Sequence, residues 1–178
     1  VARFVATLRS PARPGCIIGA MSSVLDLDRV SADDAQVGGK ARNLAKLRAA
    51  GLPCPPGVVV PAAALKGDGW RAELEAACAN LQAPLAVRSS ASIEDLSSGA
   101  APGLFDSILE VAPAAVVDAV ESVAGSAHGD AVRSYCLLRN IDPQSVAMSV
   151  VIQEQVIDVL AAGPWSVVAV LDVDDQCR

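Results

Sequence analysis

The stretch PLAVRSSASIEDLSSGAAPGLFDSILEV, residues 84–111, contains two apolar runs joined by a segment of small residues. The first run, residues 85–87, is short and apolar throughout, which is typical of a buried strand. Residues 105–111 are predicted to form a second strand. Ser, Gly, Ala and Pro fill residues 97–103, a segment that could close over a ligand or simply connect the two strands.

Arg88, Ser89 and Ser90 follow directly on the first apolar run. A guanidinium at the end of a strand can form paired hydrogen bonds with phosphate oxygens, and neighbouring hydroxyl and amide groups can add donors. The alternative is a structural ion pair between Arg88 and Glu94 or Asp95. These residues alone leave both interpretations open.

The segments on either side of this stretch alternate between helical and strand-like patterns. Apolar periodicity and turn residues predict helices at 38–51, 70–81, 113–123 and 130–139, and strands at 58–60, 146–156 and 165–171. Because helices and strands are interspersed, the predicted fold class is α+β, that is, a mixed α/β fold.

Length and composition are those of one ordinary domain with its own core. The chain has 178 residues, of which 52% are hydrophobic and only 3% aromatic, so small side chains should build the core. No apolar stretch is long enough for a transmembrane helix, and no membrane contact is expected. The formal net charge of −6 argues against a nucleic-acid partner, which normally requires a basic surface.

The titratable residues give no pattern for a metal site. The five cysteines lack any CxxC spacing, and their odd number is typical of reduced thiols in the cytoplasm. His128 is the only histidine, which excludes most catalytic triads and histidine-rich metal sites. Asp172, Asp174 and Asp175 could attract Mg²⁺, but an acidic run of this kind is typical of a solvated segment. No metal ligands are therefore assigned.

Two further segments could contact a nucleotide. Residues 38–40, GGK, combine glycines that let the backbone approach a ligand with a lysine that can offer a charge to phosphate. Taken alone, they are better interpreted as a glycine-rich helix cap with a surface lysine. Residues 152–156, IQEQV, interrupt an apolar strand at a place where backbone groups could pair with adenine. The simpler interpretation is a strand that reaches the surface.

The two ends differ from the middle of the chain. Residues 1–20 carry Arg3, Arg9 and Arg13 and no acidic residue. We interpret this segment as a disordered or spurious N-terminal extension rather than a targeting leader, with Met21 as the natural start. Residues 164–178 form a divergent C-terminal segment.

Three segments in order carry a resemblance to a known family: VGGKARNLAKLRAAGLPCPPGVVV, LAVRSSASIEDLSSGAAPGLFDSILEV and IDPQSVAMSVVIQEQV. They resemble the N-terminal nucleotide-binding domain of the phosphoenolpyruvate synthase and pyruvate phosphate dikinase family. Glucan water dikinases and rifampicin phosphotransferases share this module. The resemblance covers roughly residues 30–160 and implies an ATP-binding domain over residues 21–163.

The resemblance implies an ATP-grasp-like fold in which ATP lies between two subdomains, and it maps functional residues onto this chain. The lysine and arginine of the family motifs, which contact the polyphosphate, correspond to Lys40 and Arg88. The other phosphate-binding candidates are Ser89, Ser90, Ser98, Gly99 and Gly103. The adenine-binding candidates are Gln153, Glu154, Gln155 and Val156.

The chain also departs from the family pattern. Ala41 and Arg42 stand where the family has GGKG-A-N-L, and Pro102 stands where a small residue is common. The later Glu and Gln that hold Mg²⁺ and the triphosphate have no counterpart, and His128 does not lie in the context of the family's phosphohistidine. The ATP-grasp-like part is therefore expected to be incomplete, although the family uses Mg²⁺ with ATP.

These departures leave several interpretations open. The chain is either the ATP-binding domain of a phosphotransferase whose phosphohistidine and substrate domains are encoded separately, or an inactive truncated remnant or non-catalytic interaction module, or a non-functional translation product with frame-shifted ends. It is expected to bind adenine nucleotide weakly and to transfer no phosphate by itself. The phosphoryl acceptor is not encoded in these motifs.

Overall fold

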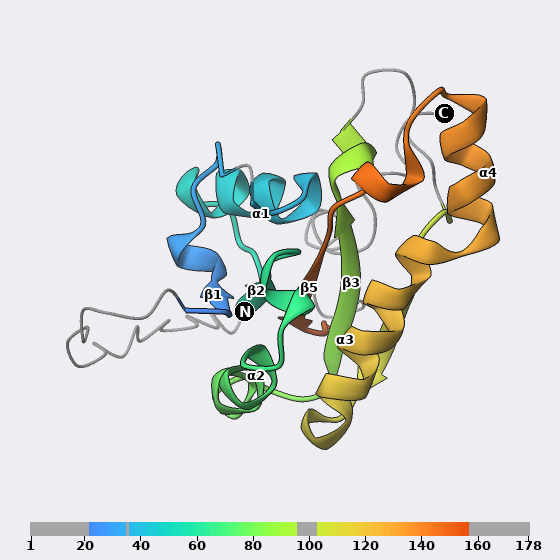
Figure 1. The fold of residues 1–178 in the computed structure, drawn as a ribbon. Coiled ribbons are helices and arrows are strands. Elements are labelled where there is room, and N and C mark those ends of the chain that lie inside the picture. Colours follow the sequence, from blue (N-terminus) through green and yellow to red (C-terminus); the bar gives the residue numbers. More distant parts are fainter. Residues whose placement is uncertain (1–21, 35, 96–102, 157–178) are drawn as a thin grey trace.

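Five strands form one antiparallel sheet in the order β1-β2-β5-β3-β4 (Figure 1). The computed structural model describes residues 22–34, 36–95 and 103–156. The strands are β1 Leu25–Asp26, β2 Gly57–Val60, β3 Leu85–Ala91, β4 Ser107–Val111 and β5 Met148–Glu154. The α-helices are α1 Gly39–Ala49, α2 Trp70–Cys78, α3 Val116–Gly125 and α4 Asp130–Leu138. Short 3-10 turns join them at Leu27–Arg29, Ala64–Lys66, Ser92–Asp95, Pro113–Ala115, Ser126–His128 and Pro143–Ser145. The predicted α+β class is confirmed.

The last of these strands, β5, lies in the middle of the sheet between β2 and β3. Its centre consists of Val150, Val151 and Ile152, all completely buried. Because β-branched side chains pack well on a pleated surface that is covered on both sides, this run forms a strand rather than a helix. The strand prediction for residues 146–156 is confirmed, with slightly shorter bounds.

The two faces of the sheet pack against different helices. Val58, Val60, Val150 and Ile152 belong to a core that α2, α3 and α4 complete. On the other face Val59 and Val151 pack against Ala41, Leu44 and Ala45 of α1. Figure 1 shows α1 and α3 on opposite sides of β3 and β5. We call the second face the α1 face, and alternation along each strand assigns further residues to it.

The predicted end of the first strand at Val87 is wrong. Strand β3 continues through Arg88, Ser89 and Ser90 to Ala91, and each of its residues has a partner in β5. The local sequence suggested a strand end because polar residues replace apolar ones there. Pairing with β5 satisfies the backbone groups of those residues, so the strand extends to its full length.

The helix predictions are confirmed with small changes in bounds. The first three residues of the predicted helix at 113–123 form a 3-10 turn that begins at Pro113, and α3 follows at Val116. The helix predicted over 70–81 ends at Cys78. The strand predicted at 165–171 and the segments 1–20 and 164–178 lie outside the described residues.

Two described cysteines are part of the main core. Cys78 and Cys136 are buried and Cys54 is half-buried, and none of the three forms a disulfide. Burial raises the pKa of the Cys78 thiol to about 11, because the apolar surroundings disfavour the thiolate.

This pKa predicts a specific dependence of stability on pH. The folded chain retains the Cys78 proton between pH 9.0 and about 11, whereas the unfolded chain releases it. The stabilising contribution of the Cys78 thiol is complete below its ordinary pKa of 9.0 and is lost as the pH rises through its pKa in the folded chain. The free energy of unfolding should fall by an amount of the order of 1–2 kcal/mol over this range. The measurement is the free energy of unfolding in urea at increasing pH. Cys78→Ala serves as control and should show a weaker decrease, and equal decreases in the two proteins would contradict the prediction.

Candidate functional site

The first turn of α1 lies directly against β3. Gly38 caps the helix, and a Cβ atom at this position would collide with the carbonyl group and the hydroxyl of Ser90. The backbone N–H of Ala41 donates a hydrogen bond of 3.1 Å to the Ser90 hydroxyl oxygen. The glycine is therefore required here because two backbone segments approach each other closely.

Ser90 acts as a cap that another element supplies to this helix. The first N–H groups of an α-helix have no partner within the helix, and the buried Ser90 hydroxyl satisfies one of them. This bond holds the first turn of α1, including the half-buried Lys40, at a defined place above β3. Ser89, the next residue back, is also buried and belongs to the opposite face by alternation.

Arg88 lies on the α1 face near the middle of β3. It pairs with Val151 of β5, which packs against α1, and with Ser107 of β4. Directly paired residues of antiparallel strands point to the same side, so the half-buried Arg88 side chain shares its face with Ser90. The two positions are separated by about 7 Å along the strand.

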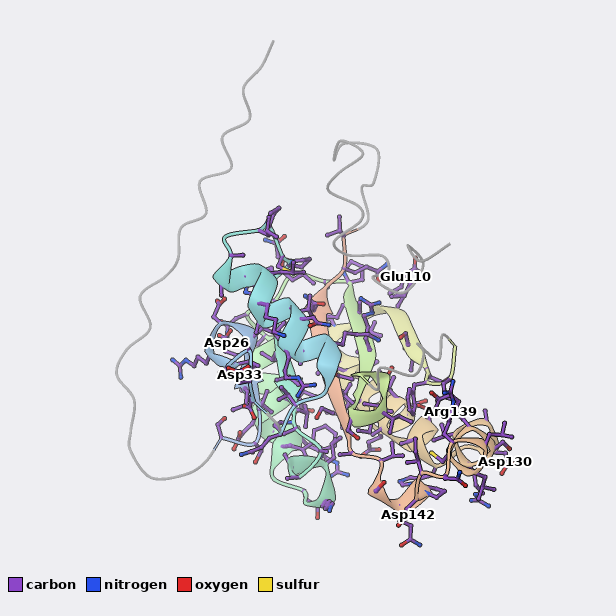
Figure 2. The ribbon with its side chains drawn as sticks, turned by 90° about the horizontal axis from the view of Figure 1, so that it is seen from above. Asp26, Asp33, Glu110, Asp130, Arg139 and Asp142 are labelled. Carbon is purple, nitrogen blue, oxygen red and sulfur yellow. The ribbon has the colours of Figure 1, made fainter. Side chains whose placement is uncertain are left out.

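The predicted adenine-binding segment, residues 153–156, lies at the far end of the same strands, where alternation places Gln153 on the α1 face and Glu154 on the opposite face. Strand β5 runs antiparallel to β3, so that Met148 pairs with Ala91 and Glu154 with Leu85. Arg88 therefore lies between the first turn of α1 and residues 153–156. Figure 2 views the sheet with α1 in front and shows Glu110 and Asp142 at its opposite ends.

The three polar side chains of residues 153–155 each bind a different segment of the chain. The Gln153 amide donates to the Pro55 carbonyl oxygen over 3.2 Å, and the Glu154 carboxylate accepts from the Gln82 N–H over 2.8 Å. The Gln155 side-chain oxygen accepts from the Glu110 N–H over 2.6 Å. The interpretation of this segment as a strand reaching the surface is therefore incomplete, because its polar groups bind two loops and strand β4.

Backbone groups strengthen the same attachment. The N–H groups of Glu154 and Gln155 donate to the carbonyl oxygens of Pro56 and Pro84 over 3.0 and 2.9 Å. The Arg48 guanidinium of α1 also donates to the Pro55 carbonyl oxygen over 3.1 Å. The turn between α1 and β2 is thus held by both a helix and the central strand.

The remaining phosphate-binding candidates fall at or beyond the edge of the described part. Ser98 and Gly99 lie outside the described residues, as does most of the segment 97–103. Gly103 is exposed, has a φ of +72°, and has no atom within 4 Å of the place where a Cβ would lie. The left-handed backbone conformation explains why a glycine occupies this position. A phosphate contact of Gly103 stays a prediction.

Two surface hollows lie away from these candidates. The larger has a volume of about 630 Å³ and lies between the 3-10 turn at Ser126–His128 and the start of β5. Lys66 and the exposed His128 line it, whereas Lys40, Arg88 and residues 153–156 do not. The hollow is thus not the site that the sequence predicts.

The described residues contain neither a metal cluster nor a membrane span. Within residues 22–34, 36–95 and 103–156, no three His, Cys, Asp or Glu side chains gather closely enough to hold a metal ion. No described helix is both long and apolar enough to cross a membrane.

The chain matches the family described as pyruvate phosphate dikinase, AMP/ATP-binding domain, over residues 69–169. This match covers more than half of the chain, and the chain therefore belongs to that family. It contains an AMP/ATP-binding domain, and the matched region includes Arg88 and residues 153–156 but begins after Lys40. A search of curated proteins found no match.

Sequence reasoning missed the residues that hold the candidate site together. Glu110 has a φ of +57°, an uncommon conformation for a non-glycine residue, and no sequence signal marks it. The contact of Gly38 with Ser90 joins residues far apart in the chain. The double glycine did signal a close approach, but it could not say that the neighbour was β3 rather than a ligand.

The Gly38 contact predicts a large effect of a single methyl group. Gly38→Ala should destabilise the fold by about 3 kcal/mol, because the added atom meets backbone that cannot move aside. Gly125→Ala is the matched control, since nothing lies within 4 Å of the added atom at that helical position. It should be neutral or stabilise by about 0.5–1 kcal/mol. Urea unfolding of both variants tests this, and equal midpoints would refute the close contact.

Proposed function

We propose that the α1 face binds an adenine nucleotide, with the polyphosphate between Lys40 and Arg88 and the base at residues 153–156. The observation that carries this proposal is the order of these groups on one face: the first turn of α1, then Arg88, then the end of β5. A nucleotide has the same linear order of charge, with phosphates at one end and the base at the other.

The electrostatics of the two cations support the phosphate end. Lys40 and Arg88 are both half-buried, so each is partly removed from water. Charge-assisted hydrogen bonds gain strength when solvent competes less, and a guanidinium can bind two phosphate oxygens at once. The positive end of the α1 dipole adds to the same field. In this proposal Ser90 orients Lys40 through the helix, while phosphate contacts of Ser89, Ser90, Ser98, Gly99 and Gly103 stay predictions.

The hydrogen bonds at the end of β5 limit how an adenine could be recognised. The N–H groups of Glu154 and Gln155 already donate to Pro56 and Pro84. A backbone N–H contact with the base would therefore come from Val156, and carbonyl oxygens of Glu154 or Gln155 would accept from the adenine amino group. The side chains of this segment serve to hold it in place.

The reaction class that we propose is phosphoryl transfer from the bound nucleotide by an ATP-grasp-like kinase. Lys40 and Arg88 would neutralise charge on the transferred phosphoryl group, which is the main contribution that proteins make to this chemistry. A separately encoded chain with the phosphohistidine domain is the proposed partner, and a cytoplasmic location agrees with the unpaired thiols. Nucleotide binding without turnover is the alternative.

Titration calorimetry of the full chain with ATP tests the binding proposal. Lys40→Ala and Arg88→Met should each weaken ATP binding roughly tenfold or more, since each removes a charge-assisted contact. Lys46→Ala is the matched control, because Lys46 is exposed and lies in the last turn of the same helix. Thermal midpoints show whether each variant is folded. If folded Lys40→Ala and Arg88→Met bind ATP as tightly as Lys46→Ala does, the proposal is wrong.

A turnover assay separates the two candidate roles. Nucleotide hydrolysis or phosphoryl transfer that disappears in Lys40→Ala supports a kinase. Binding that persists without any turnover supports a nucleotide-binding module.

A further inference from the structure

Exposed apolar side chains gather around residues 153–156. In the described part of the chain, the large apolar side chains that remain exposed are Leu52, Leu109, Leu137, Leu138 and Val156. Leu137 and Leu138 end α4. Leu109 directly precedes Glu110, which Gln155 binds. Val156 directly follows Gln155, and Leu52 lies three residues before Pro55, which Gln153 binds. Large apolar groups left exposed beside convergent polar groups are typical of a ligand site.

The register of β4 places Leu109 on the α1 face. Ser107 pairs with Arg88 and so shares its face, and Ile108 pairs with Val87 of the opposite core. Leu109 therefore points to the same side as Ser107, and its side chain is 54% exposed. Val111 packs in the same opposite core as Ile108. Regular alternation would leave one residue between them, but two residues separate Ile108 from Val111. This extra residue is a β-bulge.

The bulge is held by residues of the predicted adenine-binding segment. Glu110 has left-handed backbone, and its N–H donates to the Gln155 side-chain oxygen over 2.6 Å. The Gln155 N–H in turn donates to the Pro84 carbonyl oxygen, immediately before β3 begins. Gln155 thus joins the end of β5 to β4 across the end of β3.

Ala86 of β3 lies between the bulge of β4 and the end of β5. It lies on the α1 face, pairs with Gln153, and is opposite the bulge at Leu109 and Glu110. Its small side chain is buried, and Leu109 lies on the β4 side of it. Val156, which is also exposed, follows Gln155 on the β5 side. On the α1 face, Ala86 thus lies between Leu109 of β4 and Gln153 of β5.

We propose that Leu109 contacts the purine base and that Gln155 is the positioning residue that sets its place. The base lies against Leu109 on the α1 face, and the bond between Gln155 and Glu110 holds the bulge next to Leu109. This inference rests on the proposed nucleotide binding and adds a wall of the base site that the sequence motifs do not assign.

The position of Leu109 agrees with the proposed direction of the nucleotide. Ser107, two residues before Leu109, pairs with Arg88, and the first turn of α1 lies beyond Arg88 toward Ser90. A base at Leu109 therefore extends its phosphates along β3 toward Arg88 and Lys40. The apolar faces of a purine gain from contact with Leu109, whereas the phosphates gain nothing from it.

Comparison of ATP with inorganic triphosphate separates the base site from the phosphate site. By calorimetry on the full chain, Leu109→Ala should weaken ATP binding roughly fivefold and leave triphosphate binding unchanged, because only the base loses a contact. Leu109→Met should retain most of the ATP affinity. Leu138→Ala is the matched control, since Leu138 is even more exposed and lies on α4.

The positioning role of Gln155 has its own test. Gln155→Met removes the acceptor for the Glu110 N–H and should lower the ratio of ATP affinity to triphosphate affinity. Gln155→Glu keeps an acceptor and should restore most of this ratio. A loss that is merely structural would lower both affinities together, and that result would overturn the positioning role.

The outcomes for the two proposals differ. If ATP binding depends on Lys40 but is the same in Leu109→Ala and the unmodified chain, the contact with Leu109 is wrong and the proposed function stands. If the unmodified chain binds neither ATP nor triphosphate, both are wrong.

Discussion

The hydrogen bond from the Ala41 N–H to the buried Ser90 hydroxyl joins helix α1 to strand β3. It requires a hydroxyl inside a strand and a helix whose first turn can reach that strand, and Gly38 makes the approach possible. A buried N–H without a partner is costly, so the position of α1 over β3 is strongly determined. The place of Lys40 relative to Arg88 follows from this one contact.

A second set of polar contacts organises the opposite end of the sheet. Gln153, Glu154 and Gln155 hold the turn before β2, the turn before β3 and the bulge of β4, respectively. Two connections and one strand, distant from one another in sequence, therefore converge on the end of one central strand. Because β5 lies in the middle of the sheet, it can reach both neighbours and the strand beyond. The proposed base site and the proposed phosphate site thus lie on the same pair of strands, β3 and β5.

Membership of the pyruvate phosphate dikinase AMP/ATP-binding family accounts for part of this arrangement. The matched region contains β3, β4 and β5, whereas α1 precedes it. The fold brings the earlier segment onto the matched one through Gly38 and Ser90. A family defines the scaffold and the class of ligand, but activity depends on which groups meet at the site. For this chain the decisive quantities are therefore the affinities of its variants for ATP and triphosphate.

The local sequence pattern was sufficient to predict most helices and strands and to indicate the family. The spacing of Trp70, Leu74 and Cys78 defines α2, and the β-branched centre of β5 defines a buried strand, because side-chain periodicity is a property of the segment itself. Only the tertiary structure decided which strands pair with each other and to which side of the sheet their side chains point. β3 continues through Arg88 because β5 supplies partners to it, and Val111 returns to the opposite core because a bulge at Glu110 resets the alternation. Register and bulges depend on a partner strand tens of residues away, and no local window of sequence contains that partner.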